Sequence, residues 1–126
     1  MAAATAPYPR SHRLLTAAQY QRVFRHCQAR SSDRYLTVLA VANDLPHARL
    51  GSAVSIRNAG NAVRRNRIKR LIRESFRLHQ DILGGWDVVV LARPDTATLD
   101  NRQLFTALDT HWRKIAAHAH TGSDTH

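Results

Sequence analysis

Hydrophobic residues near the start of the chain recur at helical spacing. Tyr20, Val23 and Phe24 fall on one face of a helix. Thr16 and Gln19 stand just before them in the order of a capping box, in which each side chain bonds the other's backbone N–H. We therefore predict a first helix over residues 16–26.

Three apolar runs predict strands. Residues 35–42 (YLTVLAVA) are rich in side chains that suit a pleated surface, and the sequence NDLP at 43–46 is a turn signal. Residues 49–55 follow this turn, so we expect the two segments to form a hairpin. Residues 86–92 (WDVVVLA) predict a buried strand, which Pro94 ends.

Residues 62 to 78 or 79 predict a helix that is apolar on one side and basic on the other. Ile68, Leu71, Ile72 and Phe76 form the apolar stripe of a helix that faces a core. Arg64 and Arg65 fall outside the opposite arc, and we place them at the helix entry, where unpaired backbone N–H groups favour phosphate. The opposite arc holds Asn66, Arg67, Lys69, Arg70, Arg73 and Arg77.

A last helix is predicted to open near residue 98 or 100, with Leu104, Leu108 and Ile115 on one stripe and Trp112 beside it. At 126 residues and 44% hydrophobic content, the chain suits one domain with a single core. We expect this domain to span 13–117, between a disordered tail at 1–12 and a loose tail at 118–126.

The charge balance indicates a nucleic-acid partner. The chain has 19 Lys and Arg against 9 Asp and Glu, for a net charge of +10. A basic run can be a merely solvated helix face, but only Glu74 interrupts this one. No apolar run approaches the roughly 20 residues that span a bilayer. Cys27 stands alone and no secretory signal is evident, so we expect a cytoplasmic protein without disulfides.

Other chemistry finds little support in the sequence. His111, His118, His120 and His126 could suggest a metal site, but they spread over a helix end and a tail, so we expect no protein-bound metal. The acidic residues are scattered and offer no adjacent pair for Mg²⁺, and no nucleotide-binding or nucleophile motif is present. A nuclease that works without RNA is therefore not expected.

The basic charge fits two classes of protein other than a partner of one large structured RNA. A DNA-binding regulator would normally bring a helix-turn-helix or a dimer zipper, and neither pattern is present. A ribosomal or other structural RNA-binding protein fits the charge equally well. A binding preference for duplex DNA, co-purification with ribosomal subunits, or co-purification with one large structured RNA would separate the three classes.

Residues 62–77 (AVRRNRIKRLIRESFR) resemble the signature of the bacterial ribonuclease P protein subunit, an Arg-Asn-Arg triplet followed by Lys-Arg and then Arg-Glu. The flanking segments agree in order and spacing: Arg13-Leu14 ahead of the first helix, Arg49-Leu50-Gly51 at the start of a strand, and DVVVLARP at 87–94. The resemblance covers about residues 13–116.

The resemblance implies a fold and separate roles for the protein and an RNA subunit. The fold is an α/β (α+β) two-layer sandwich of the ribosomal-protein-S5-domain-2-like type, with the order α-β-β-α-β-α and an unusual left-handed β-α-β crossover. In this family the catalyst is a metal-dependent RNA subunit, which removes the 5′ leader of precursor tRNA. The protein assists it by binding the catalytic RNA and the leader. Mg²⁺ belongs to the holoenzyme and is bound mainly by RNA, and no obligate protein partner is expected.

The resemblance also assigns residues. Tyr20 and Phe24 match aromatic side chains of the leader-binding cleft, although core packing is an alternative for both. The third cleft position corresponds to Val38, where relatives often have an aromatic residue. Ile56 replaces a frequent basic residue, so phosphate contact after that strand should depend on Arg57 alone. The residues expected to bind the catalytic RNA are Arg57, Arg64, Arg65, Asn66, Arg67, Lys69, Arg70 and Arg73.

Overall fold

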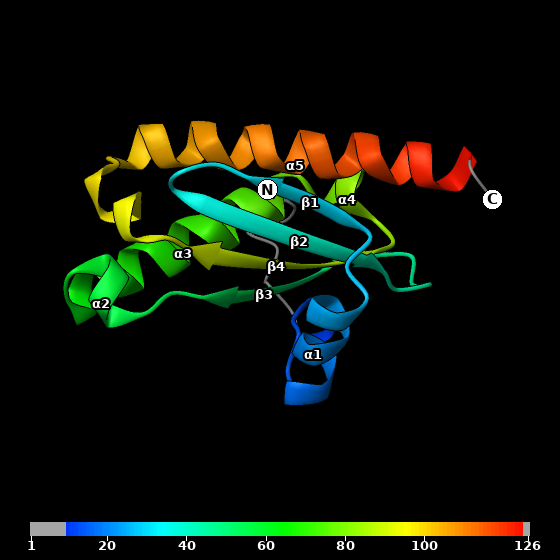
Figure 1. The fold of residues 1–126 in the computed structure, drawn as a ribbon, viewed down its shortest axis with the longest axis horizontal. Helices are drawn as coiled ribbons and strands as arrows, with labels where there is room; N and C mark the ends of the chain where they lie inside the picture. Colours follow the sequence, from blue (N-terminus) through cyan, green and yellow to red (C-terminus); the bar gives the residue numbers. More distant parts are fainter. Residues whose placement is uncertain (1–9, 125–126) are drawn as a thin grey trace, which may run out of the picture.

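A four-stranded mixed sheet forms the centre of the protein in the computed structural model (Figure 1), which describes the backbone of residues 10–124 and the side chains of residues 11–118. The strand order is β1-β2-β4-β3. Strand β4 is antiparallel to β2 and parallel to β3. The strands are β1 (Ala29–Ser32), β2 (Leu36–Ala42), β3 (Arg49–Ala53) and β4 (Trp86–Ala92).

The predicted hairpin between β2 and β3 is wrong. Strand β4 lies between them and pairs with both, with Val90 opposite Val38 of β2 and Val88 opposite Leu50 of β3. Six of the seven residues of β4 are buried, because both of its faces are covered, and such a strand belongs at the centre of a sheet. Strand β1 was not predicted, because its sequence ARSS has too few apolar residues to be recognised.

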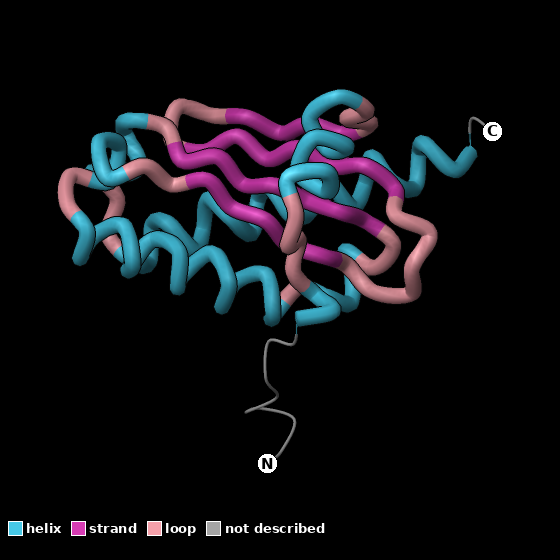
Figure 2. The backbone as a smooth tube through the Cα atoms, turned by 90° about the horizontal axis from the view of Figure 1, so that it is seen from below, coloured by secondary structure: helices cyan, strands magenta, loops and turns pink. Residues whose placement is uncertain are grey.

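Helices cover the two faces of the sheet unequally. Helices α3 (Ala62–Leu78) and α5 (Asn101–Asp124) pack on one face, and α1 (Ala17–Arg25) crosses the other, as Figures 1 and 2 show from two directions. Strands β3 and β4 are joined by a left-handed crossover through α3, flanked by the short helices α2 (Ile56–Ala59) and α4 (Gln80–Leu83). The expected sandwich is thus confirmed, with β1, α2 and α4 added to the predicted order.

Capping residues in the sequence mark where helices α1 and α5 begin. Thr16 caps α1 by accepting the N–H of Gln19, whose side chain accepts the N–H of Thr16 in return, so the predicted capping box is confirmed. Asp100 and Gln103 form the same reciprocal arrangement at the start of α5. Residues 1–9 of the predicted N-terminal tail lie outside the described part of the chain. The predicted C-terminal tail is instead helical to Asp124, and residues 125 and 126 lie outside the description.

The main core lies between the sheet and the pair α3 and α5. The predicted stripe of α3 is buried there, and Trp112 of α5 packs edge-on against Phe76 at 6.0 Å between ring centroids. The indole N–H of Trp112 donates to the buried hydroxyl of Ser75 at 2.8 Å. This bond satisfies both buried polar groups and fixes the contact between the two helices.

His111 of α5 is a structural residue. Its side chain is buried, and its ring nitrogens lie 2.6 Å from Oγ of Ser31 and 2.9 Å from Oδ2 of Asp33. Burial lowers the pKa of His111, although the carboxylate of Asp33 opposes the effect. Helix α5 is therefore fastened to β1 by a buried polar contact as well as by its apolar stripe.

Candidate nucleic-acid interface

The basic side of α3 faces away from the main core. Arg64, Asn66, Arg70 and Arg73 are exposed, whereas Arg65, Arg67 and Lys69 are half-buried. The predicted arc is therefore present, but its members differ in how strongly the rest of the protein holds them. That difference determines which side chains can turn toward a phosphate at little cost.

Arg65 and Arg67 are tied to neighbouring elements. The Nε of Arg65 donates to the carbonyl of Val54, just after β3, at 2.7 Å. Arg67 donates to the carbonyl of Leu99 at 3.3 Å and to the side chain of Asn101 at the start of α5. These two arginines therefore position α3 between β3 and α5, while their remaining N–H groups stay available to an anion.

The entry to α3 is built as predicted. Asn61 caps the helix by accepting the backbone N–H of Arg64 at 2.8 Å, so Arg64 and Arg65 lie in the first turns. Gly60 precedes the cap with a φ of 103°, a conformation that glycine adopts at little cost. Arg57 lies in α2 at the same end of the molecule and is exposed. Exposed cations thus surround a helix N-terminus, where backbone N–H groups also attract phosphate.

A hollow of about 140 Å³ connects the basic helix to α1. Lys69 and Arg73 line it from α3, and Tyr20 lines it from α1. Burial lowers the pKa of Lys69, and the nearby charges of Arg65 and Arg73 lower it further. A bound phosphate would relieve this repulsion between like charges. The other lining residues are Arg13, Leu14, Leu50, Gly51 and Ser52.

The side chain of Tyr20, which belongs to α1, packs against strand β3. Its hydroxyl accepts the backbone N–H of Ser52 at 3.3 Å. A Cβ atom on Gly51 would come within 2.7 Å of the Tyr20 ring, so the absence of a side chain at Gly51 gives the ring its place. Gly51 was not predicted as part of the site, because nothing local in the sequence connects it with a residue so far away in the chain.

The other two predicted cleft residues have different surroundings. Phe24 is 44% exposed on α1, so core packing does not account for it. Val38 is fully buried in the main core, on the face of the sheet that α3 and α5 cover, so its assignment to the cleft is wrong. Its neighbour Leu39 packs instead with Val23 and Tyr20 on the face that α1 crosses. The match to the family placed the cleft position on the wrong face of β2, and the strand's own pattern could not reveal this, because almost every residue of that strand is apolar.

A buried carboxylate holds α1 against the sheet. Asp87 of β4 accepts two hydrogen bonds from the guanidinium of Arg49, at 2.7 and 2.8 Å, and one from Asn43 at 2.9 Å. Arg22 of α1 lies 3.6 Å from the same carboxylate and donates to the carbonyl of Ala42 at 2.7 Å. The apolar contact beneath α1 is small, so this polar cluster contributes to the angle at which α1 presents its aromatic side chains.

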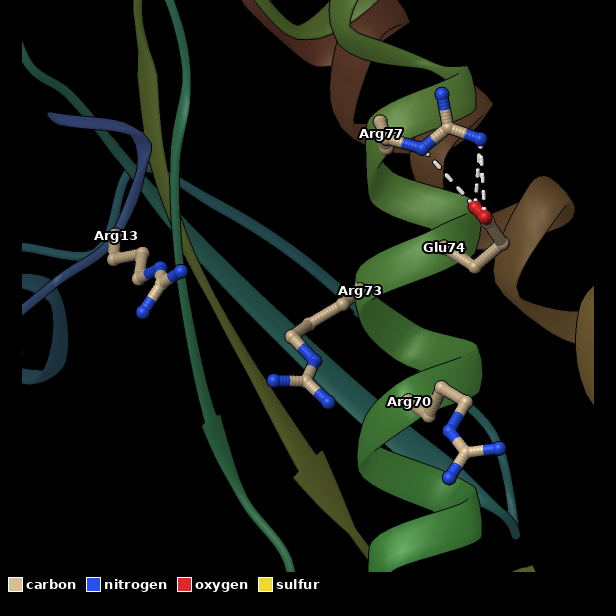
Figure 3. Close-up of a pocket in the computed structure, with 5 residues that line it drawn as sticks. All are labelled: Arg13, Arg70, Arg73, Glu74 and Arg77. Carbon is tan, nitrogen blue, oxygen red and sulfur yellow. Dashed lines mark hydrogen bonds and ion pairs between the residues drawn. The ribbon is translucent and has the colours of Figure 1, made fainter. Parts of the chain in front are cut away.

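A second hollow, of about 210 Å³, opens on the outer side of α3 (Figure 3). Arg13 approaches it from the segment before α1, and Arg70, Arg73, Glu74 and Arg77 line it from α3. Four guanidinium groups surround this opening, and such groups bind anions through charge-assisted hydrogen bonds, although the guanidinium of Arg77 is already paired with Glu74. Arg13 was not predicted as part of a binding site, although the segment Arg13-Leu14 belongs to the pattern that resembles the family.

The described residues contain no group of three or more His, Cys, Asp and Glu side chains placed to hold a metal ion. Among the described helices, none has both the length and the apolar character needed to cross a bilayer. Guanidinium groups, which bind phosphates, and the ring of Tyr20, on which a base can stack, line the two hollows.

A mixed sheet with a basic crossover helix on one face and an aromatic-bearing helix on the other defines an α+β protein whose surface is rich in guanidinium groups. The family model described as Ribonuclease P matches residues 8–116. The chain therefore belongs to the ribonuclease P protein family.

Relatives and solved structures agree with this assignment. The chain is 50% identical to the ribonuclease P protein component of Methylococcus capsulatus over 105 residues, which covers 83% of this chain and 81% of that protein. It is 42% identical to the component from Pseudomonas aeruginosa, over 86% and 80% of the two chains. The ribonuclease P protein of Staphylococcus aureus superposes with a TM-score of 0.74 at 32% identity, covering 81% of this chain and 93% of that one. The Thermotoga maritima protein gives 0.69 at 29% identity, covering 80% and 96%.

Proposed function

We propose that this protein is the protein subunit of a ribonuclease P ribonucleoprotein. It binds the catalytic RNA and the 5′ leader of precursor tRNA, and thereby assists the endonucleolytic cut that yields the mature 5′ end. The observation that carries this proposal is the hollow between Tyr20, Lys69 and Arg73, where the aromatic side of α1 meets the basic side of α3. One continuous surface can then hold a structured RNA and a single strand together.

The two parts of the surface bind different RNAs: the basic side of α3 binds the catalytic RNA, and the aromatic side of α1 binds the leader of precursor tRNA. Guanidinium groups of α3 suit the phosphates of a folded RNA, because they contact phosphate in a bidentate manner whatever the base sequence. Tyr20 and Phe24 suit the leader, because any base can stack on an aromatic ring. The proposed anchor for the catalytic RNA comprises Arg57, Arg64, Arg65, Asn66, Arg67, Lys69, Arg70 and Arg73.

We assign no catalytic residue to the protein. Asp87 is bound by Arg49 and Asn43, Glu74 by Arg77, and Asp33 by backbone N–H groups and His111. These carboxylates are occupied by hydrogen-bond donors, so Mg²⁺ for the cleavage would be held mainly by the RNA. The proposed partners are the catalytic RNA and precursor tRNA in the cytoplasm, with no membrane and no obligate protein partner.

Reconstitution tests this function. The protein should stimulate cleavage of precursor tRNA when it is added to the catalytic RNA of its own organism at low Mg²⁺, where that RNA alone is slow. The protein alone should cleave nothing, even at high Mg²⁺. Cleavage by RNA-free protein would contradict the proposal, as would a failure to stimulate the RNA at any Mg²⁺ concentration.

A further inference from the structure

Glu74 is the only acidic side chain on the basic side of α3. Its carboxylate accepts three hydrogen bonds from the guanidinium of Arg77, one turn later, at 2.7 to 3.0 Å. Figure 3 shows this pair on the helix, with both side chains turned toward each other at the rim of the hollow. The Arg77 side chain is only 25% exposed and that of Glu74 39%, so water screens the pair only in part.

The other arginines of α3 at this hollow have no such commitment. No hydrogen bond or ion pair joins Arg70 or Arg73 to another described side chain, and both are exposed. They can turn toward a phosphate without breaking an existing contact. Arg77 would first have to leave Glu74, and the carboxylate would then repel the incoming phosphate.

We infer that Glu74 is a specificity-determining residue of this RNA-binding surface: it withholds Arg77 from phosphates and so limits the binding of RNAs that do not fit. The inference rests on the proposed function, since it concerns the same surface. It adds a residue that weakens one kind of complex to a surface otherwise built for attraction.

The physical reason lies in how unrelated RNAs bind. Phosphate contacts carry no sequence information, and every cation on the surface strengthens non-specific and specific binding together. A flexible RNA can shift to reach any accessible guanidinium, whereas a folded RNA docks in one position and gains only where a phosphate already lies. Neutralising one guanidinium with a fixed carboxylate therefore costs the poorly fitting RNA more than the fitting one, a form of discrimination by repulsion.

The test compares Glu74→Gln with Asp81→Asn, which makes the same change of charge at an exposed position on α4. Binding is measured against the catalytic RNA and against polyuridylate, over a series of salt concentrations. Glu74→Gln should tighten polyuridylate binding about threefold at low salt and steepen its salt slope by about 0.7, the value for one added phosphate contact on a single strand. Affinity for the catalytic RNA should change less, and Asp81→Asn should change neither slope.

A double-mutant cycle isolates the withheld arginine. Arg77→Gln should weaken polyuridylate binding only slightly in the parent protein, because it leaves the Glu74 carboxylate without its guanidinium, and should abolish the gain in the Glu74→Gln background. This cycle uses only an unrelated RNA, so it stays decisive even if the parent protein shows no preference for the catalytic RNA. The absence of that preference would count against the proposed function alone.

Four results would overturn the role of Glu74. Weaker or unchanged polyuridylate binding by Glu74→Gln would mean that the carboxylate withholds nothing. An equal gain for both RNAs, or an equal gain in Asp81→Asn, would reduce the effect to net charge. A full loss of affinity in Arg77→Gln alone would show that Arg77 already binds RNA in the parent protein.

Discussion

Replacing Gly51 by alanine should disturb the leader site without unfolding the domain. The added methyl group would lie 2.7 Å from the nearest ring carbons of Tyr20, whereas carbon atoms in contact are about 3.5–4.0 Å apart. The ring must therefore move by about 1 Å. It can do so because the clash involves the far end of one side chain, and no strained backbone conformation is required at Gly51.

The size of the effect follows from what the ring loses. Its hydrogen bond with the backbone of Ser52 is worth about 0.5–1.5 kcal/mol of folding stability. A displaced ring also loses much of its stacking on a leader base, which is worth about 1–3 kcal/mol. We therefore expect leader-dependent affinity to fall by roughly five- to 150-fold, with a loss of only a few degrees in Tm.

The assay measures the affinity of the reconstituted complex for precursor tRNA and for mature tRNA, which lacks the leader. Gly51→Ala should weaken binding of the first and leave binding of the second unchanged. In a Tyr20→Ala background the same substitution should have almost no further effect, because the ring it displaces is absent. Equal losses in the two backgrounds, or equal losses for the two tRNAs, would refute the reasoning.

Three further outcomes are expected. Arg70→Gln combined with Arg73→Gln should flatten the salt dependence of catalytic-RNA binding by roughly 1.4–1.8, two phosphate contacts, with no change in Tm. Burial lowers the pKa of His111, so the unfolded chain binds more protons than the folded protein below pH 6.5. The free energy of unfolding, measured by chemical denaturation, should therefore fall from pH 7 to pH 5, and it should fall less steeply in His111→Gln. Asp87→Ala should lower the free energy of unfolding by roughly 3–5 kcal/mol, because it leaves Arg49 largely buried without its carboxylate; a urea midpoint close to that of the parent protein would contradict this.

The helices could be predicted from the sequence because their signals are local. Thr16 and Gln19 fix the start of α1, and the spacing of Ile68, Leu71, Ile72 and Phe76 fixes which side of α3 is buried. The same spacing puts the guanidinium groups on the other side, so the basic surface was predictable as well. Each of these properties depends on residues within a few turns of one helix.

The pairing of the strands was decided by the tertiary structure. A turn signal between β2 and β3 suggested a hairpin, but β4 arrives from more than thirty residues later and pairs with both strands. The face on which Val38 lies was also not predictable. Strand β2 is covered on both sides, so it lacks the alternation of polar and apolar residues that would mark its faces.

The finer features of the site depend on contacts between distant segments. The sequence contains Tyr20 and Gly51, but only the crossing of α1 over β3 makes the size of one residue control the position of the other. Likewise, the triplet around Asn66 predicts an RNA-binding helix, but does not reveal that Arg65 and Arg67 also hold α3 against β3 and α5. The sequence by itself determined the three longer helices, three of the four strands and their chemical character, because these arise from neighbours along the chain. The tertiary structure decided which side chains meet, because those contacts depend on how the elements pack.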